Sequence, residues 1–517
     1  MRAGPLAART GGGLCGALTL AALALAAWLL WVPLARVVLA NDMLGYAAQG
    51  RSLLLGDGND VRLDQALIPG YYPAGMPALV ALAMALLGPD LRHAQVVVWA
   101  AALLLLALTA VVARRTAGPW AGLVALLLVL ASTQWRVAAT AILSQVPTAV
   151  VVLLSTLLLT GRATRARAFG AGLLASGSLI LRFANVGFPV AVVLAGPLLA
   201  RDRELPARRW LGALAAGLAA GGALVALHNT WFHGGPLATG YSSYEHDVAQ
   251  NFALSNILHP WSEGLQELGS VILRSLAGFG DLYPVPVALA AAWGLVVLLR
   301  AGGEPRRVAL LALLAVAAQD LILAAYPFRS ELYLVPAFPL QALVAAAGLV
   351  DAAGRLWTRG GPLLATGAAA ALLAFDLARP PAPVAPTLEE AVARHDMLER
   401  AGRELGPDFA LLTPADFGLV EPLVRAPGRR ILYAAPHVSA LIAEAAMREA
   451  GGAPYSAGVA VEWAAARLAE GRDVYVDQLP PPRVLRPEHR ELKEALRARF
   501  TFEPTSLPGL FRLRARG

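Results

Sequence analysis

Eleven apolar segments, each close to the length of a membrane span, dominate this 517-residue sequence. A helix that crosses a bilayer needs about 20 mostly apolar residues. Hydrophobic residues make up 57% of the chain and charged residues only 15%, which is too apolar for an ordinary soluble protein. We therefore predict a polytopic α-helical membrane protein. Its predicted spans are 14–34, 91–113, 118–133, 140–160, 168–184, 186–200, 209–228, 284–300, 307–326, 331–350 and 360–378.

Arginine clusters fall at every second connection between these segments. They are Arg2/Arg9, Arg114/Arg115, Arg162/Arg165/Arg167, Arg201/Arg203/Arg208/Arg209, Arg300/Arg306/Arg307 and Arg355/Arg359. We expect the protein in the inner or plasma membrane of the cell. The positive-inside rule then places the N-terminus and these loops in the cytoplasm. The remaining connections, including 35–90 and 229–283, face outward, as does the chain beyond 379. These arginines account for much of the net charge of +8, so we expect no nucleic-acid partner.

The composition changes near residue 378, where the last apolar segment ends. Residues 379–387 form a proline-rich linker, and polar and apolar residues alternate beyond it. The pattern predicts strands at 410–414, 430–434 and 473–477, helices at 387–402, 437–450, 459–470 and 487–499, and a strand pair over 501–514. We therefore predict two domains, a transmembrane domain over 1–378 and a small extracytoplasmic α/β domain over 388–517. We find no phosphate loop or metal-ligand spacing in the second domain, which favours packing or acceptor docking over catalysis.

The outer loop 35–90 contains the first candidate for chemistry, Asp42. Residues 43–56 and 76–87, like 265–277 in the second long loop, predict short helices lying at the membrane interface. An ionisable group at such a depth is costly and is usually paired, hydrated or functional. Asp42 either caps the helix that begins near Met43 or acts as a general base whose pKa is raised by apolar surroundings.

Two further sets of residues lie near predicted outer ends of spans. The turn-rich segment 228–241 holds His228, His233 and Tyr241; the histidines either bind a metal or, as we prefer, order the loop. Arg182 and Arg329 lie within or beside apolar segments, and Arg136 and Arg274 are weaker candidates of the same kind. A guanidinium there either binds an anion such as phosphate or extends its charge toward water.

These segments, in this order, resemble the GT-C superfamily of polyprenyl-phosphate-sugar-dependent glycosyltransferases. The similarity is greatest to the protein-mannosyltransferase and lipid A aminoarabinose-transferase type, and it extends from residue 14 to about 350. It rests on Asp42, Tyr46, Ala48 and 54–56, on 72–77 and 79–88, and on 142–154, 181–190, 228–241 and 328–343.

The resemblance implies an enzyme that transfers a sugar from a polyprenyl-phosphate donor to an acceptor hydroxyl of a lipid, glycan or protein on the extracytoplasmic face. Its first-loop aspartate, here Asp42, serves as the base of an inverting reaction, and Arg329 and Arg182 match arginines that bind the donor phosphate. We assign substrate binding to Tyr46, Tyr72, His228, Tyr241 and Gln145. Gln145 stands where many members have an acid, so we assign no metal ligand at the site. No cofactor is certain, and a divalent metal is left as an open alternative.

Two alternatives use the same residues. A transporter or flippase of lipid-linked sugars would need the arginines but no bond cleavage, although we find no internal repeat of the kind many transporters have. An inactive scaffold of the same fold would keep the spans and lose the chemistry. The sequence specifies neither the sugar, the acceptor nor the linkage.

Overall fold

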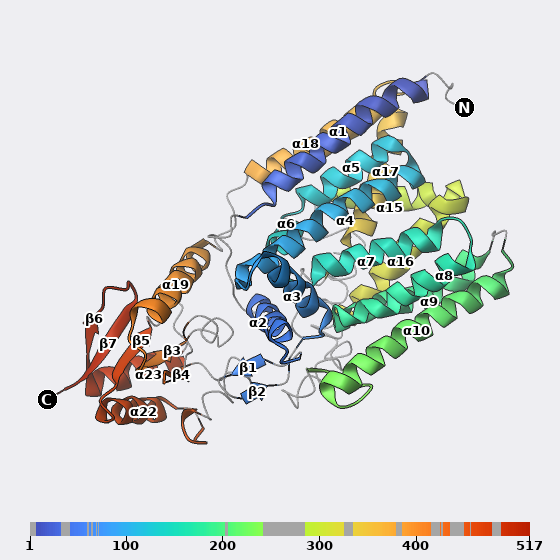
Figure 1. Cartoon of the computed structure of the whole chain (residues 1–517). Coiled ribbons are helices and arrows are strands. Elements are labelled where there is room, and N and C mark those ends of the chain that lie inside the picture. Colours follow the sequence, from blue (N-terminus) through green and yellow to red (C-terminus); the bar gives the residue numbers. More distant parts are fainter. Residues whose placement is uncertain are drawn as a thin grey trace, which may run out of the picture.

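The computed structural model of the protein describes most of the chain. The described residues are 7–32, 42–58, 61–63, 66–68, 70, 72–201, 205–240, 285–324, 334–378, 385–414, 424, 428–434, 449–454, 456–477 and 487–516. Within them the chain forms a bundle of long helices and, near the C-terminus, a small sheet with its own helices (Figure 1).

Each of the predicted spans holds a helix. They are α1 (Ala7–Leu29), α4 (Ala94–Ala117), α5 (Pro119–Ala131), α7 (Gln145–Thr160), α8 (Arg165–Gly177), α9 (Gly187–Ala200), α10 (Ala207–His233), α15 (Val285–Ala301), α16 (Gly303–Ala324), α17 (Phe338–Leu356) and α18 (Gly361–Ala378). Within the described residues, four helices are long and apolar enough to cross a membrane. A fifth span results if α5 and α6 (Thr133–Thr140), which meet at 75°, form one broken span. Several of the other apolar helices are shorter, and α16 and α17, with 22 and 19 residues, are long enough but carry charged residues. Length and composition therefore identify fewer spans than the sequence predicts.

Glycines bring the helix backbones of the bundle into direct contact. A Cβ atom on Gly294 of α15 would lie 1.9 Å from the carbonyl oxygen of Val344, and one on Gly348 of α17 would lie 1.9 Å from that of Ala290. Small residues at helix crossings permit this close approach in membrane proteins, where packing rather than water exclusion drives association. α15 and α17 therefore pack through a reciprocal pair of glycines.

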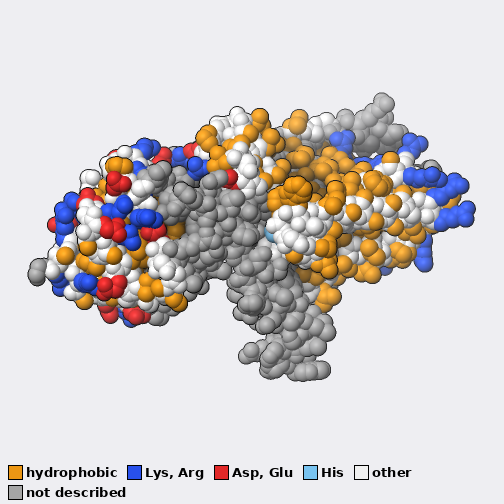
Figure 2. Space-filling view, turned by 60° about the horizontal axis from the view of Figure 1, so that its bottom comes forward, with side chains coloured by type: hydrophobic (Ala, Val, Ile, Leu, Met, Phe, Trp, Pro, Cys, Tyr) orange, Lys and Arg blue, Asp and Glu red, His pale blue; other side chains and the backbone are white. Residues whose placement is uncertain are grey.

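One end of the bundle gathers the arginine clusters. Arg115 pairs with Glu304 at 3.1 Å, Arg307 donates to the carbonyl oxygen of Thr160 at 3.0 Å, and Arg167 donates to that of Leu157 at 2.7 Å. Figure 2 shows Lys and Arg side chains concentrated at the end of the bundle farthest from the C-terminal sheet, beyond a broad hydrophobic band. Loops that are distant in sequence thus share one end, as the alternation of arginines predicts.

The opposite end carries the short elements of the first long loop. The predicted interfacial helices are present as α2 (Asp42–Leu55) and α3 (Gly75–Leu87). Between them β1 (Val61–Leu63) and β2 (Ala66–Ile68) form an antiparallel pair that the sequence analysis missed. The helix α6 was also missed, because its eight residues include polar ones and the segment was interpreted as a loop. The predicted helix 265–277 lies outside the described residues.

A five-stranded sheet forms near the C-terminus in the order β4-β3-β5-β7-β6. The predicted strands are confirmed as β3 (Phe409–Thr413), β4 (Arg430–Tyr433) and β5 (Asp473–Asp477), which run parallel, and as the antiparallel pair β6 (Phe500–Pro504) and β7 (Leu510–Ala515). Three predicted helices are present as α19 (Ala385–Glu404), α22 (Ala457–Ala469) and α23 (Pro487–Arg499). Most of the predicted helix 437–450 lies outside the described residues.

The predicted proline-rich linker is shorter than expected from the sequence. α18 continues to Ala378 and α19 begins at Ala385, so the last three residues assigned to the linker are helical. Asp376, at the end of α18, accepts hydrogen bonds from Thr133 at 2.9 Å and forms an ion pair with Arg136 of α6. The end of the last apolar helix is thereby fixed to the bent pair α5–α6.

We predict that Gly348→Ala destabilises the bundle. The new methyl group would overlap the backbone of α15, and overpacking of this kind costs about 1–3 kcal/mol. The measurement is the thermal midpoint of the purified protein in detergent. Gly354→Ala on the same helix is the control: a Cβ there meets nothing within 4 Å, and alanine favours the helix, so this variant should be at least as stable as the original. Equal stability of the two variants would contradict the packing.

Candidate functional site

A buried polar cluster joins three segments at the end of the bundle that carries α2. The Tyr46 hydroxyl of α2 lies 2.9 Å from the Ser144 hydroxyl, which immediately precedes α7. Ser144 also accepts a hydrogen bond from Nη1 of Arg182 at 3.3 Å. All three side chains are buried, with relative exposures of 2%, 0% and 7%. The cluster therefore holds a guanidinium beside two hydroxyls, groups that suit an oxygen-rich anion.

Arg182 lies in a break between α8 and α9, where the sequence analysis expected nearly continuous spans. Two short 3₁₀ turns, η3 (Ser178–Ile180) and η4 (Phe183–Val186), flank it, and its own backbone is extended. Asn185 closes the break by donating to the Ser178 hydroxyl at 2.6 Å. Non-helical backbone within a bundle of apolar helices is tolerated where other protein segments surround it. Here the break directs the Arg182 side chain into the cluster.

Helix α16 supports this break from the other side. Gln319 donates from Nε2 to the carbonyl oxygen of Ala184 at 3.2 Å. Gly187 permits the approach, since a Cβ atom there would lie 2.9 Å from the backbone nitrogen of Gln319. The next residue, Asp320, is a carboxylate with a relative exposure of 5%. The sequence analysis did not select Asp320, although a charge within the apolar segment 307–326 was a usable signal.

Tyr72 is fixed against α2 by both its backbone and its ring. Gln49 donates to the Tyr72 carbonyl oxygen at 3.0 Å and accepts from the Tyr72 N–H at 3.1 Å. The Tyr72 ring stacks on that of Tyr46, with centroids 4.2 Å apart. Gly45 makes room for it, because a Cβ atom there would lie 2.3 Å from the Tyr72 ring. The two predicted substrate-binding tyrosines thus form one unit.

His228 holds the segment before α3 to the end of α10. Its Nε2 accepts a hydrogen bond from the Ala74 N–H at 3.0 Å, so the neutral ring carries its proton on Nδ1, which lies 3.0 Å from Oδ1 of Asn229. Asn229 in turn donates to the carbonyl oxygen of Pro236 at 3.3 Å. Both ring nitrogens are engaged, which favours the interpretation that His228 orders the loop. His233 lies beside it, with ring centroids 5.7 Å apart.

The predicted site residues are placed to different extents. Four of them lie at this end of the bundle and make the contacts described above: Tyr46, Tyr72, Arg182 and His228. Gln145 is the first residue of α7 and follows Ser144. Gln145 is buried, and within the described residues its Oε1 has no hydrogen-bond partner. Asp42 begins α2, one helical turn before Tyr46, so the two positions share a face. The side chain of Asp42 lies outside the described residues, as do Tyr241 and Arg329.

The sequence analysis did not select Ser144 of the cluster or Gln49, which holds Tyr72, and the reason is the same for both. Ser144 and Gln49 are uncharged and ordinary in composition, and their partners lie 98 and 23 residues away. Nothing local marks such residues as important. The weaker candidate Arg136 is explained differently, since its ion pair with Asp376 gives it a structural partner.

The chain is similar in structure to a known membrane transferase. No family model matches the sequence, and no curated protein matches it. The crystal structure of ArnT from Cupriavidus metallidurans bound to undecaprenyl phosphate superposes with a TM-score of 0.60 and 14% identity, covering 97% of each chain. Its apo state gives a TM-score of 0.65 and 16% identity, covering 96% of this chain and 97% of that one. ArnT is an aminoarabinose transferase of GT-C fold, so the predicted GT-C-like fold is confirmed.

We predict that Gln49→Leu destabilises the protein by about 1–3 kcal/mol, because it removes both hydrogen bonds to the Tyr72 backbone at a buried position. Thermal unfolding in detergent measures the change. Gln95→Leu is the matched control: Gln95 is equally buried, and within the described residues neither amide atom has a hydrogen-bond partner, so leucine should be neutral or stabilising. Similar losses in both variants would mean that volume, not hydrogen bonding, decides the outcome.

Proposed function

We propose that the protein is a membrane glycosyltransferase that moves a sugar from a polyprenyl-phosphate donor to an acceptor hydroxyl. The observation that carries the proposal is the similarity of fold, over nearly the whole of both chains, to ArnT bound to undecaprenyl phosphate. The buried cluster of Arg182, Ser144 and Tyr46 supports it independently, because a guanidinium with neighbouring hydroxyls suits a phosphate.

The proposed topology places this chemistry outside the cytoplasm. In it the eleven helices cross the cell or inner membrane, and the end that gathers the arginines is cytoplasmic. The opposite end, with α2, α3 and the cluster, is extracytoplasmic. The domains are then 1–378 in the membrane and 388–517 outside, joined through 379–387, whose last three residues belong to α19. The gathering of arginines at one end of the bundle supports this orientation (Figure 2).

The proposed reaction is a direct displacement at the anomeric carbon. Asp42 accepts the proton of the acceptor hydroxyl as its oxygen attacks. The bond between the anomeric carbon and the phosphate oxygen breaks, its electron pair stays on that oxygen, and the sugar inverts. The departing polyprenyl phosphate is an anion and needs charge stabilisation more than a proton, which Arg182 and Arg329 supply.

The remaining candidates orient the substrates in this proposal. Tyr46 links the base to the arginine, since it follows Asp42 by one helical turn and its hydroxyl meets Ser144 beside Arg182. Tyr72, stacked on Tyr46, and Gln145, beside Ser144, contact the sugar. His228 acts indirectly by holding the segment before α3, and Tyr241 completes the outer side. The neutral amide of Gln145 gives no charged oxygen to a metal at this point.

We predict that Asp42→Asn lowers transfer about 10²–10⁴-fold, because the amide cannot accept the proton. The measurement is release of polyprenyl phosphate by protein reconstituted with a polyprenyl-phosphate sugar and an acceptor. Asp57→Asn, two residues beyond the opposite end of α2 and so about 20 Å from Asp42 at about 1.5 Å per helical residue, is the control and should retain activity. Full activity of a folded Asp42→Asn protein would remove Asp42 from the mechanism. Movement of the lipid-linked sugar without release, by the original protein, would favour a flippase instead.

We predict that Arg182→Gln lowers kcat/KM for the donor about 10–100-fold, the equivalent of one charged hydrogen bond. Arg182→Lys should fall between, since it keeps the charge and loses the planar fork. Arg136→Gln is the control: it removes an arginine from the same end of the bundle that pairs with Asp376, and donor kinetics should be unchanged. Equal kinetic losses in Arg182→Gln and Arg136→Gln would point to general damage rather than donor binding.

A further inference from the structure

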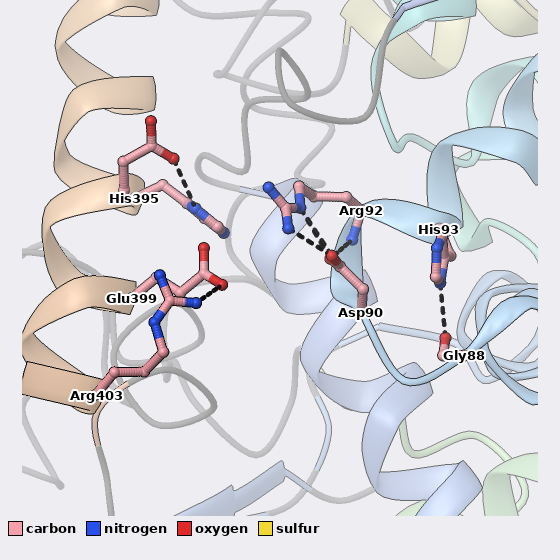
Figure 3. Close-up of polar contacts among 8 residues, drawn as sticks. Gly88, Asp90, Arg92, His93, His395, Glu399 and Arg403 are labelled. Atoms are coloured by element: carbon pink, nitrogen blue, oxygen red, sulfur yellow. Dashed lines mark hydrogen bonds and ion pairs between the residues drawn. The ribbon is translucent and has the colours of Figure 1, made fainter.

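Three potential metal ligands lie together on α19, where this helix approaches η2 (Leu91–His93) of the bundle. Ligand atoms of His395, Asp396 and Glu399 all lie within 4.8 Å of one another. His395 and Glu399 are four residues apart, so they share a face of the helix. Figure 3 shows both side chains directed from α19 toward the segment that carries Asp90 and Arg92.

The imidazole of His395 is buried without a hydrogen bond from the described part of the chain. Its relative exposure is 5%, and its nearest charged neighbour is Oδ1 of Asp396, 3.8 Å from Nδ1 and beyond hydrogen-bonding distance. A neutral imidazole nitrogen with a free lone pair is the form that binds a metal ion. The ring therefore offers a nitrogen ligand beside the carboxylates of Asp396 and Glu399.

Charged groups of both signs lie near the ring: the carboxylates of Asp90, Asp396 and Glu399 and the guanidinium of Arg92. Arg92 itself is engaged with Asp90, its Nε lying 3.0 Å from both carboxylate oxygens. This leaves Asp396 and Glu399 as the negative charges beside the ring.

Arg403 is the competing partner of Glu399, at 2.8 Å. Its side chain is 64% exposed, and ion pairs formed by such exposed groups contribute little to stability. A divalent ion therefore displaces Arg403 at small cost. Ligands about 2.0–2.2 Å from a zinc ion lie about 3.5 Å from one another, so modest rotations of Asp396 and Glu399 suffice to close the site.

We propose that His395, Asp396 and Glu399 form a divalent-metal site on α19, facing the bundle. One imidazole nitrogen and two carboxylate oxygens suit Zn²⁺ or a similar first-row ion, with a fourth position left for water. The site is separate from the proposed transfer chemistry and does not depend on it. Its effect is to stiffen α19 where the C-terminal sheet and its helices meet the bundle.

The test is a titration of tag-free, full-length, chelator-stripped protein in detergent with Zn²⁺ alone, followed by calorimetry. We expect one site, abolished by His395→Ala and weakened at least tenfold by Glu399→Gln, and a rise in thermal midpoint with Zn²⁺ that His395→Ala lacks. His93→Ala is the matched control, because that ring lies 2.8 Å from the Gly88 carbonyl oxygen and takes no part in the site.

Two results would overturn the proposal. One is no saturable Zn²⁺ binding by the original protein, which would leave only an ion-pair network. The other is binding of unchanged affinity in both Glu399→Gln and Asp396→Asn, which would place the ion elsewhere. Both substitutions lie at more exposed positions than His395, so they test the site even if His395→Ala fails to fold.

Discussion

The hydroxyl of Ser144 is the point on which the polar end of the bundle depends. It meets the Tyr46 hydroxyl from α2 and the Arg182 guanidinium from the break between α8 and α9, all in a buried setting. Burying a guanidinium costs free energy unless its N–H groups donate hydrogen bonds. The Ser144 hydroxyl accepts one of these bonds from Arg182 and can at the same time bond the Tyr46 hydroxyl. Three segments that are far apart in sequence are thereby brought to one place.

The segment before α3 is held at that place from three directions. Gln49 of α2 hydrogen-bonds both the carbonyl oxygen and the N–H of Tyr72. His228 of α10 accepts a hydrogen bond from the Ala74 N–H. Gly75 lies against the break itself, since a Cβ atom there would come within 2.6 Å of the Ile180 carbonyl oxygen. The short elements of this segment are therefore not a loose loop, since α2, α10 and the break between α8 and α9 each hold it in place.

Sequence patterns predicted the long elements well because burial repeats along them. The apolar segments, strand β5 and the pair β6–β7 each contain enough residues for such a pattern. The missed elements lack it: β1 and β2 have three residues each, and α6 is short and partly polar. Ser144 and Gln49 have roles set only by partners that the fold supplies. The sequence analysis did not select His395 and Glu399, which stand one helical turn apart on α19.

Helix α19 lies between the sheet and the bundle and faces both of them. Arg394 pairs with Asp477 at 3.2 Å, at the end of β5, where Thr413 of β3 also donates to Asp477 at 2.9 Å. The next residue along the helix, His395, faces Arg92 of η2. On the other side of 379–384, Asp376 fixes α18 to α6. Adjacent residues of α19 thus contact the sheet and face the bundle. The helix therefore links the sheet to the end of the bundle that carries η2.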